Sequence, residues 1–186
     1  IQIVMKRSTD GGTTWSAQTV VARNGTVQAG NAVPLLDMKD PRYPNGRLFL
    51  FYNTGNVSES TLRNGGKGSR EQYVVTSVDN GLTWDTPRNI TAQTAKMSQA
   101  PYNNPAGWRT LAMGPGHGLQ HSNGRLIVPG NFTAGPPLAG YADGRAYVFY
   151  SDDHGDTFKI GNPASYPGAN ESTAAELSDT MVMLNS

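Results

Sequence analysis

The stretch Ser77–Trp84, with the sequence SVDNGLTW, occurs in two further versions in this chain. They are Ser8–Trp15 (STDGGTTW) and Ser151–Phe158 (SDDHGDTF). The shared pattern is S-x-D-x-G-x-T followed by Trp or Phe, and its copies begin at residues 8, 77 and 151. Because five fixed positions recur three times at an interval of roughly 70 residues, the pattern predicts a repeated structural unit.

The chemistry of this box suits a turn that closes a β-hairpin. Each copy follows a strand-like run, at Ile1–Arg7, Gln72–Thr76 and Arg145–Tyr150. Asp and Ser accept hydrogen bonds from nearby backbone N–H groups, and Gly supplies a positive φ. We therefore expect three equivalent hairpins, each burying the aromatic residue of its box: Trp15, Trp84 and Phe158.

The segments between the boxes have room for two more strands in each repeat. Val33–Asp37 can pair with Arg47–Asn53, and Gly118–Gln120 can pair with Arg125–Val128. Four strands in a repeat of about 70 residues are typical of a propeller blade. Propellers close with roughly four to eight blades, more than this chain can hold. The predicted fold is all-β, with four-stranded antiparallel blades, and both ends are expected to be cut from a longer protein.

The composition supports this fold and excludes several classes of function. The 186 residues include 22 glycines and 12 prolines, and 16% are charged. Coiled coils, helical bundles and highly charged disordered chains need fewer glycines and prolines or more charged residues than this chain has. A net charge of +1 gives no reason to expect nucleic acid or an anionic membrane as a partner. No apolar run approaches the roughly 20 residues that span a bilayer. The absence of cysteine excludes disulfides and thiolate sites.

The boxes resemble the Asp-box, or bacterial neuraminidase repeat, and further segments are similar to sialidases of the six-bladed propeller type. These segments are Gly30–Asp37, Gly114–Gln120, Asn123–Pro129 and Asn170–Asp179. The resemblance implies an all-β fold, roughly half of a six-bladed β-propeller. Residues 1–186 would form one incomplete domain, with a partial first blade, two fuller blades and the start of a fourth. It also implies a secreted or periplasmic location, and as partners sialylated glycans and the missing blades of the parent chain.

The same resemblance implies a retaining exo-sialidase that uses a tyrosine nucleophile, a glutamate partner and no cofactor. Sialic acid carries a carboxylate beside its reacting carbon, so a neutral phenol approaches more easily than a second carboxylate. The phenol has an ordinary pKa of about 10 and needs a base to accept its proton. Glu176 matches that glutamate. The alternative is that Glu176 is an ordinary exposed carboxylate on a strand.

Five further residues are candidates for contacts with the substrate. Asn31 matches a position that contacts sialic acid in the family, although it could equally cap a turn. Glu59, in a loop rich in Ser, Asn and Gly, matches an acidic contact. His117 is expected to line the pocket floor or to hydrogen-bond to the backbone. Asn131 and Phe132 fall where relatives carry aromatic residues that face the glycerol and N-acyl groups.

The histidines do not predict a metal site. His117 and His121 have the spacing of a zinc motif, but that motif needs a helix, and Pro115, Gly116 and Gly118 disfavour one. The third box resembles a calcium loop but lacks the later bidentate Glu of an EF-hand. No metal or cofactor is therefore predicted.

The resemblance places most of the catalytic residues outside residues 1–186. An arginine and an acid/base aspartate would precede Ile1, and two arginines and the tyrosine would follow Ser186. We therefore expect this chain alone to be inactive. The arginines that it does contain match none of the family's carboxylate-binding triad and are expected to be solvated or structural: Arg7, Arg63, Arg70, Arg109, Arg125 and Arg145. A non-catalytic Asp-box propeller that binds glycans or proteins is the alternative function, and sialic acid transfer stays open.

Overall fold

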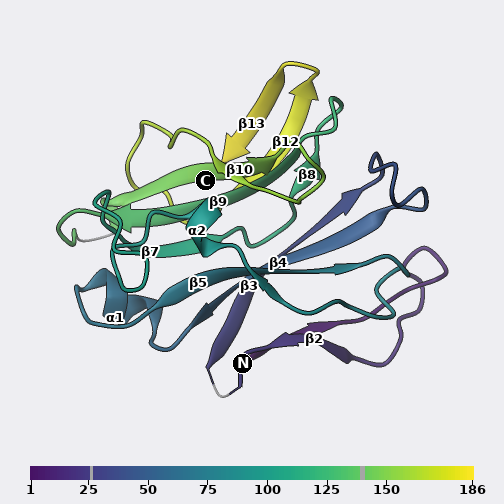
Figure 1. Cartoon of the computed structure of the whole chain (residues 1–186), viewed down its shortest axis with the longest axis horizontal. Coiled ribbons are helices and arrows are strands. Elements are labelled where there is room, and N and C mark those ends of the chain that lie inside the picture. Colours follow the sequence, from purple (N-terminus) through teal and green to yellow (C-terminus); the bar gives the residue numbers. More distant parts are fainter. Residues whose placement is uncertain (26, 139–140) are drawn as a thin grey trace.

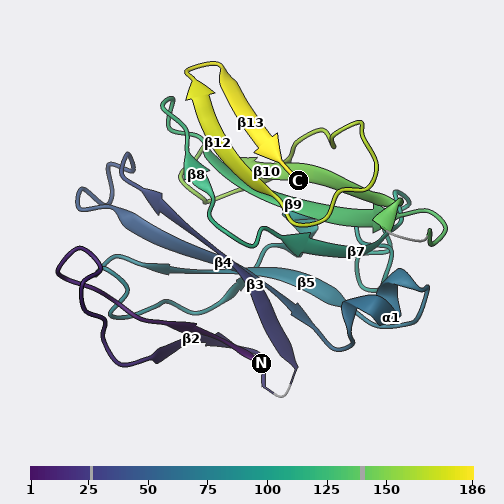
Figure 2. The ribbon, with the colours of Figure 1, turned by 180° about the vertical axis from the view of Figure 1, so that it is seen from behind.

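A computed structural model describes residues 1–25, 27–138 and 141–186. Within these residues the chain forms antiparallel sheets that lie one after another (Figure 1), and Figure 2 shows the same arrangement from behind. The helices there are α1 (Glu59–Arg63) and α2 (Thr91–Thr94), and neither is long and apolar enough to cross a membrane. The prediction of an all-β fold is confirmed.

The sheets follow the order of the chain. The first contains β1 (Gln2–Met5) and β2 (Thr19–Arg23). The second has the order β3 (Gln28–Asp37), β4 (Arg47–Gly55), β5 (Arg70–Ser77), β6 (Arg88–Asn89). The third contains β7 (Trp108–Met113), β8 (Leu119–Gln120), β9 (Leu126–Ala134), β10 (Gly144–Ser151) and β11 (Lys159–Ile160). The fourth contains β12 (Thr173–Ser178) and β13 (Met181–Asn185).

The inner strand of the third sheet is interrupted. Both β7 and β8 pair with β9, so together they occupy one position in the sheet. The glycine-rich segment between them, residues 114–118, joins the two parts. Sequence reasoning found the second part and missed β7, because the interruption removes the continuous pattern that identifies a strand.

The inner strands β3, β7–β8 and β12 run side by side in the same direction. The amide of Gly118 donates to the carbonyl of Pro34 (3.0 Å), and the amide of Ser172 donates to the carbonyl of Gly114 (2.9 Å). Farther along, the amide of Met38 donates to the side chain of Gln120 (2.8 Å). Residues at the same level of neighbouring inner strands can therefore be identified from these bonds.

The two ends of these strands differ in kind. One end, which we call the Asp-box end, holds the three boxes together with the turns 38–46, 121–125 and 179–180. The other, the long-loop end, holds the connections 56–69 and 90–107 and the described parts of 24–27, 135–143 and 161–172. In Figure 1 the Asp-box end lies to the right and the long-loop end, with α1, lies to the left.

All three boxes form the same hydrogen-bonded turn. In the second box, Ser77 Oγ donates to Asp79 (2.7 Å) and accepts from the amide of Gly81 (2.8 Å), and Asp79 accepts from the amide of Thr83 (2.9 Å). The corresponding bonds recur in the other two boxes. The fixed glycine has a positive φ each time, as does the residue before it: Gly11, Asn80 and His154. The predicted turn chemistry is confirmed.

The aromatic residues of the second and third boxes pack against the preceding sheet. Phe158 is only 5% exposed and meets Phe51 of β4 edge-on, with ring centroids 5.7 Å apart. Trp84 is half-buried and lines a hollow with Met5 of β1. Trp15 is 61% exposed, so the expectation that it is buried was wrong. The reason is that no sheet precedes the first one in the part of the chain that the structure describes.

The main hydrophobic core fills the space between the second and third sheets. Phe49 and Phe51 of β4 face Tyr147 and Phe149 of β10, and all four rings are fully buried. Gly155 of the third box lies against Phe49, and a Cβ at this glycine would stand 2.5 Å from the ring. Its φ of +83° disfavours a side chain as well. The third box can therefore dock only with glycine at this position.

We predict that Gly155→Ala lowers the free energy of unfolding by about 3 kcal/mol, because it combines backbone strain with overpacking against Phe49. Gly12→Ala is the matched control. Gly12 occupies the same place in the first box with a φ of +91°, but a Cβ there would meet only Trp15, at 3.7 Å. The control should cost about 1 kcal/mol, from the backbone alone. Chemical denaturation measures both, and equal losses would contradict the docking argument.

A second prediction concerns acid stability. Hydrogen bonds from the Thr83 hydroxyl and amide and from Ser77 lower the pKa of Asp79 to about 2. A carboxyl whose pKa is lowered on folding stabilises the protein at pH values above its unfolded pKa of about 4. This contribution is lost as the pH falls toward the pKa of the folded state. The melting temperature of the wild type should therefore fall more steeply between about pH 4 and pH 2 than that of Asp79→Asn.

The control for this measurement is Asp179→Asn, which changes an exposed carboxylate in the β12–β13 turn. This variant should follow the wild-type pH profile. A wild-type profile in Asp79→Asn would mean that the box carboxylate does not contribute to acid sensitivity.

Candidate functional site

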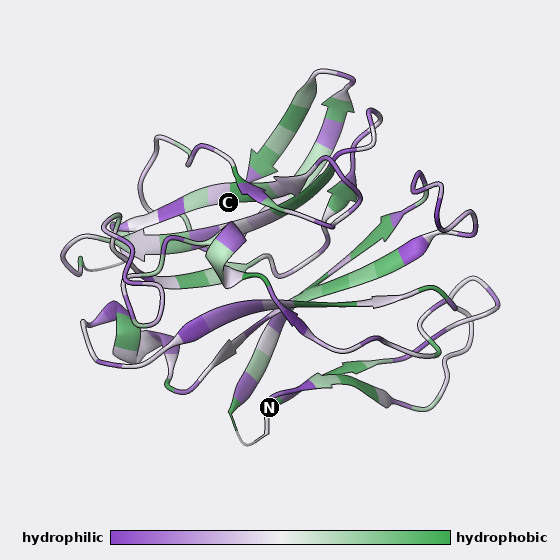
Figure 3. Ribbon diagram, viewed as in Figure 1, coloured by the Kyte–Doolittle hydropathy of each residue, from purple (hydrophilic) through white to green (hydrophobic). Residues whose placement is uncertain are grey.

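Asn31 and Glu59 meet at the long-loop end, where a single arginine contacts both. The Nη2 atom of Arg70 donates to Asn31 Oδ1 (3.3 Å), and its Nη1 atom lies 3.4 Å from Glu59 Oε2. Arg70 begins β5, in the polar part of that strand (Figure 3), and is 3% exposed. Of the two roles expected for the arginines, Arg70 therefore has the structural one, since it is not solvated.

Local structure places each of these two acceptors. Asn31 lies at a bulge of β3 and has a φ of +54°, a conformation that Asn tolerates better than most residues. Glu59 is the first residue of α1. Ser58 caps that helix, its Oγ accepting from the amide of Thr61 (3.1 Å). The bulge and the cap fix the two backbones before any ligand binds.

Burial lowers the pKa of the Arg70 guanidinium, and the charge of Glu59 opposes this effect. In the described residues, neither Nε nor Nη1 of Arg70 makes a hydrogen bond. The guanidinium therefore depends on a small number of acceptors, of which Asn31 and Glu59 are two.

Asn131 and Phe132 are neighbours on β9 but face opposite sides of the sheet. Phe132 stacks on Trp108 with a centroid distance of 3.7 Å and belongs to the main core. Asn131 is 4% exposed, and its Nδ2 group has no acceptor among the described residues. The two residues therefore do not present one common surface, and the contact of each with substrate stays a prediction.

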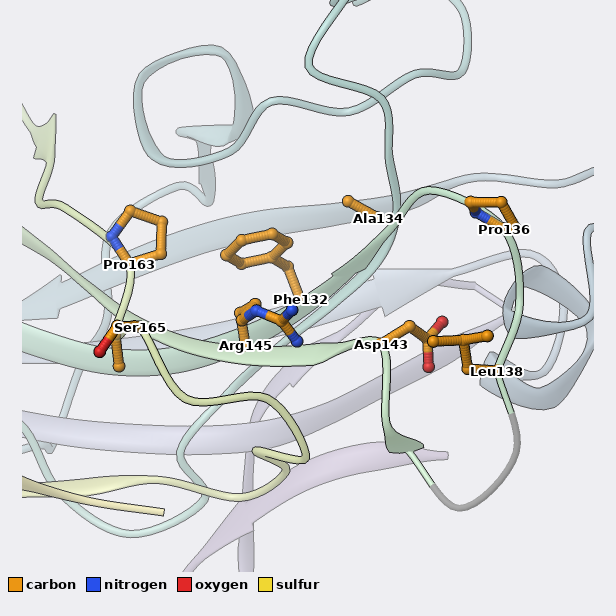
Figure 4. Close-up of a pocket in the computed structure, with 9 residues that line it drawn as sticks. Phe132, Ala134, Pro136, Leu138, Asp143, Arg145, Pro163 and Ser165 are labelled. Carbon is orange, nitrogen blue, oxygen red and sulfur yellow. The ribbon is translucent and has the colours of Figure 1, made fainter.

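The Phe132 ring also borders a hollow of about 470 Å³ at the long-loop end. Figure 4 shows Pro163 and Arg145 beside the ring, and Asp143 next to Leu138 farther along the hollow. Asp143 is paired with Arg63 (3.3 Å) and with Arg109, so its charge is neutralised within the protein. The hollow is consequently a mainly apolar recess.

His117 lies in the glycine-rich segment between β7 and β8. Its side chain is exposed, and its Nδ1 atom is 3.0 Å from the carbonyl of Gly118. The backbone contact is one of the two roles expected for it. His121 is buried and points instead toward Glu176, with 3.6 Å between Nε2 and Oε1.

Among the described residues, Asp37, Asp40 and His154 are the group whose ligand atoms lie close enough together for a metal ion. Their atoms are already engaged. Asp37 lies 2.8 Å from the ring of His154 and accepts from the amide of Lys39 (2.8 Å). Asp40 accepts from the guanidinium of Arg42, which also reaches the third box. This cluster connects the third box to the second sheet.

Glu176 lies on β12 near the Asp-box end. Its Oε2 atom accepts from the amide of Ser122 in the β8–β9 turn (2.9 Å). Hydrogen bonding by Ser122, together with the nearby His121 and Lys39, lowers the pKa of Glu176. The carboxylate is therefore ionised at neutral pH and ties the fourth sheet to the third.

The candidate residues thus divide between the two ends. Along the inner strands, Asn31 lies at about the same height as Gly114 and Ser172. Glu176 lies at the height of the β8–β9 turn. The other glutamate of this segment, Glu171, precedes β12 and is exposed. Five residues of extended chain, about 16 Å, separate the two glutamates. Sequence reasoning selected Glu176 and did not single out Glu171, which lies in the same segment.

We predict that Glu176→Gln lowers the melting temperature at neutral pH and that the difference from wild type narrows below about pH 4. The reason is that a lowered carboxyl pKa stabilises the folded state only above that range. Glu171→Gln, at an exposed position, is the control and should leave the melting temperature nearly unchanged. A constant difference between Glu176→Gln and wild type across this pH range would contradict the charge-based bond to Ser122.

The fold and its turns define a partial β-propeller of the sialidase type, with antiparallel blades closed by Asp boxes. The chain belongs to the BNR repeat-like domain family, whose model matches residues 1–185. Within that family it is similar to sialidases, which confirms the resemblance drawn from the boxes.

Two curated relatives illustrate this similarity. The sialidase of Micromonospora viridifaciens is 34% identical over 204 residues, which cover 99% of this chain and 27% of the relative. The sialidase of Clostridium perfringens is 28% identical, and the match covers 98% of this chain and 46% of the relative. The chain thus spans less than half the length of these relatives.

Solved structures agree with this assignment of the fold. A Hadza microbial sialidase superposes with a TM-score of 0.79 at 25% identity, over 99% of this chain and 35% of that one. Trypanosoma rangeli sialidase in complex with sialic acid gives a TM-score of 0.70 at 19% identity, over 99% and 29%. The partial propeller of the sialidase type is therefore confirmed.

Proposed function

We propose that residues 1–186 supply part of the substrate pocket of an exo-sialidase, which removes terminal sialic acid from glycoconjugates, and that this pocket lies at the long-loop end. The observation that carries the proposal is the shared contact of Asn31 and Glu59 with Arg70. These two residues were selected from separate segments of the sequence, and they come together at one end of the inner strands. Long loops at one end of a propeller are a usual place for a ligand site.

The chemistry of the two side chains suits the uncharged edge of sialic acid. Asn31 can donate from Nδ2 while its Oδ1 accepts from Arg70, and Glu59 keeps an oxygen free to accept. A hydroxyl or N-acyl group offers the matching acceptor and donor. The sugar carboxylate needs cationic groups instead, which the resemblance to sialidases places outside these residues.

The proposed mechanism is retaining, with a tyrosine from outside these residues as nucleophile. Because the sugar already carries a carboxylate, a neutral phenol meets less repulsion, but a base must accept the phenol proton. That base must share the pocket with Asn31 and Glu59. Glu176 is hydrogen-bonded to Ser122 near the Asp-box end. We therefore propose Glu171, and not Glu176, as the base that accepts the phenol proton.

The test is steady-state kinetics on the complete gene product that contains residues 1–186, with a fluorogenic sialoside. We predict that Glu171→Gln lowers kcat by about a hundredfold or more, because the phenol loses its proton acceptor. Glu176→Gln is the matched control, the same change at the glutamate of β12, and kcat should stay within about threefold of wild type. Thermal melts check that both variants fold.

Three other outcomes would change the interpretation. The reverse result, with Glu176→Gln inactive and Glu171→Gln active, would return the catalytic role to Glu176 and move the pocket to the Asp-box end. A wild-type gene product that binds sialyllactose without hydrolysing it would favour the non-catalytic propeller. The isolated chain of 186 residues is expected to show no turnover, and turnover by it would mean that the catalytic groups lie within residues 1–186.

A further inference from the structure

We infer that Arg70 is a positioning residue of the substrate pocket, which holds Asn31 and Glu59 in fixed relative places so that the two recognise adjacent donor and acceptor groups on a sugar. This inference rests on the proposed function. The role of Arg70 is indirect. This buried residue does not touch the substrate and acts only through the two side chains that it contacts.

Arg70 reaches across the sheet to the inner strand. Arg70 begins β5, Asn31 lies on β3, and β4 separates the two strands. Opposite Arg70 on β4 is Gly55. A Cβ at Gly55 would stand 3.7 Å from Arg70 Cγ, so the arginine stem runs close over a position that carries no side chain. The absence of a side chain at Gly55 leaves room for the guanidinium to reach the inner strand.

The buried charge of Arg70 depends on its acceptors. A buried guanidinium is unfavourable unless its donors are paired. The side chain of Arg70 is 3% exposed, and two of its nitrogens make no hydrogen bond in the described part of the chain. The contacts with Asn31 Oδ1 and Glu59 Oε2 therefore stabilise the Arg70 guanidinium more than an ion pair at the surface would. Moving either acceptor away would leave the buried charge with fewer partners.

Arg70 also orients the two side chains that it contacts. Because Asn31 Oδ1 accepts from a cation, the Nδ2 group of Asn31 is the part left to donate to a ligand. Glu59 meets the same guanidinium with Oε2, which leaves Oε1 to accept. The planar fork of arginine contacts both groups at once, whereas a lysine ammonium is a single point charge on a flexible stem. Preorganised groups of this kind lose less conformational freedom when they bind a ligand.

The experiment uses Arg70→Lys in the complete gene product, with kcat and KM for a fluorogenic sialoside measured separately. We expect KM to rise about tenfold, the equivalent of one or two misplaced hydrogen bonds, with kcat within about threefold of wild type. The control is Arg109→Lys, which changes another largely buried arginine at this end, paired with Asp143 instead. An unchanged KM in folded Arg70→Lys would overturn the inference.

A second measurement does not depend on activity. In the 186-residue chain, the side-chain amide resonance of Asn31 should shift in Arg70→Lys and stay in place in Arg109→Lys. An unmoved resonance in Arg70→Lys would refute positioning even if catalysis were altered. If the wild-type gene product has no sialidase activity, the proposed function fails, but this resonance still tests the role of Arg70.

A substitution at Glu59 covers the case in which Arg70→Lys does not fold. Glu59→Gln removes the ion pair and keeps the size of the side chain. If Arg70 couples its two partners, the Asn31 amide resonance shifts in this variant although Asn31 itself is unchanged. An unmoved resonance would show that the two contacts are independent and would overturn the inference.

Discussion

Each outer hairpin of this chain depends on hydrogen bonds between the aspartate of an Asp box and a threonine four residues later. In the second box, Asp79 accepts from both the amide and the hydroxyl of Thr83. Ser77 completes the turn by donating to Asp79 and accepting from Gly81. All these bonds are local, so the turn can form without a neighbouring sheet. The same turn then presents its aromatic residue to the sheet that precedes it.

Packing between the second and third sheets builds on this turn. Gly155 of the third box lies against Phe49, and Arg88 donates to the carbonyl of Asp156 (2.9 Å). His154 of the same box contacts the buried Asp37 at the end of β3 (2.8 Å). The Asp-box end is therefore held by paired polar groups as well as by aromatic contacts. Its groups are largely engaged in holding the fold together.

The long-loop end has a different balance. Arg70 and Asn131 are buried there or nearby, and each has donors without partners among the described residues. Buried polar groups are normally hydrogen-bonded, so such groups gather where water or a ligand completes the set. Most of the buried polar atoms that lack a partner in the described residues lie toward the long-loop end, with Arg47 Nε and Trp84 Nε1 as exceptions at the Asp-box end. This imbalance is the physical basis for proposing a pocket at the long-loop end.

The sequence was enough to predict the repeated turns, the all-β fold and the family, because each follows from short-range chemistry repeated three times. It did not predict β7, because a glycine-rich interruption hides the inner strand, or the exposure of Trp15, because burial depends on a neighbouring sheet. The contact of Asn31 with Arg70, 39 residues away, and the position of Glu176 near the opposite end became visible only in the folded chain. The register of strands and the stacking of sheets set those distances, and neither is contained in a local pattern.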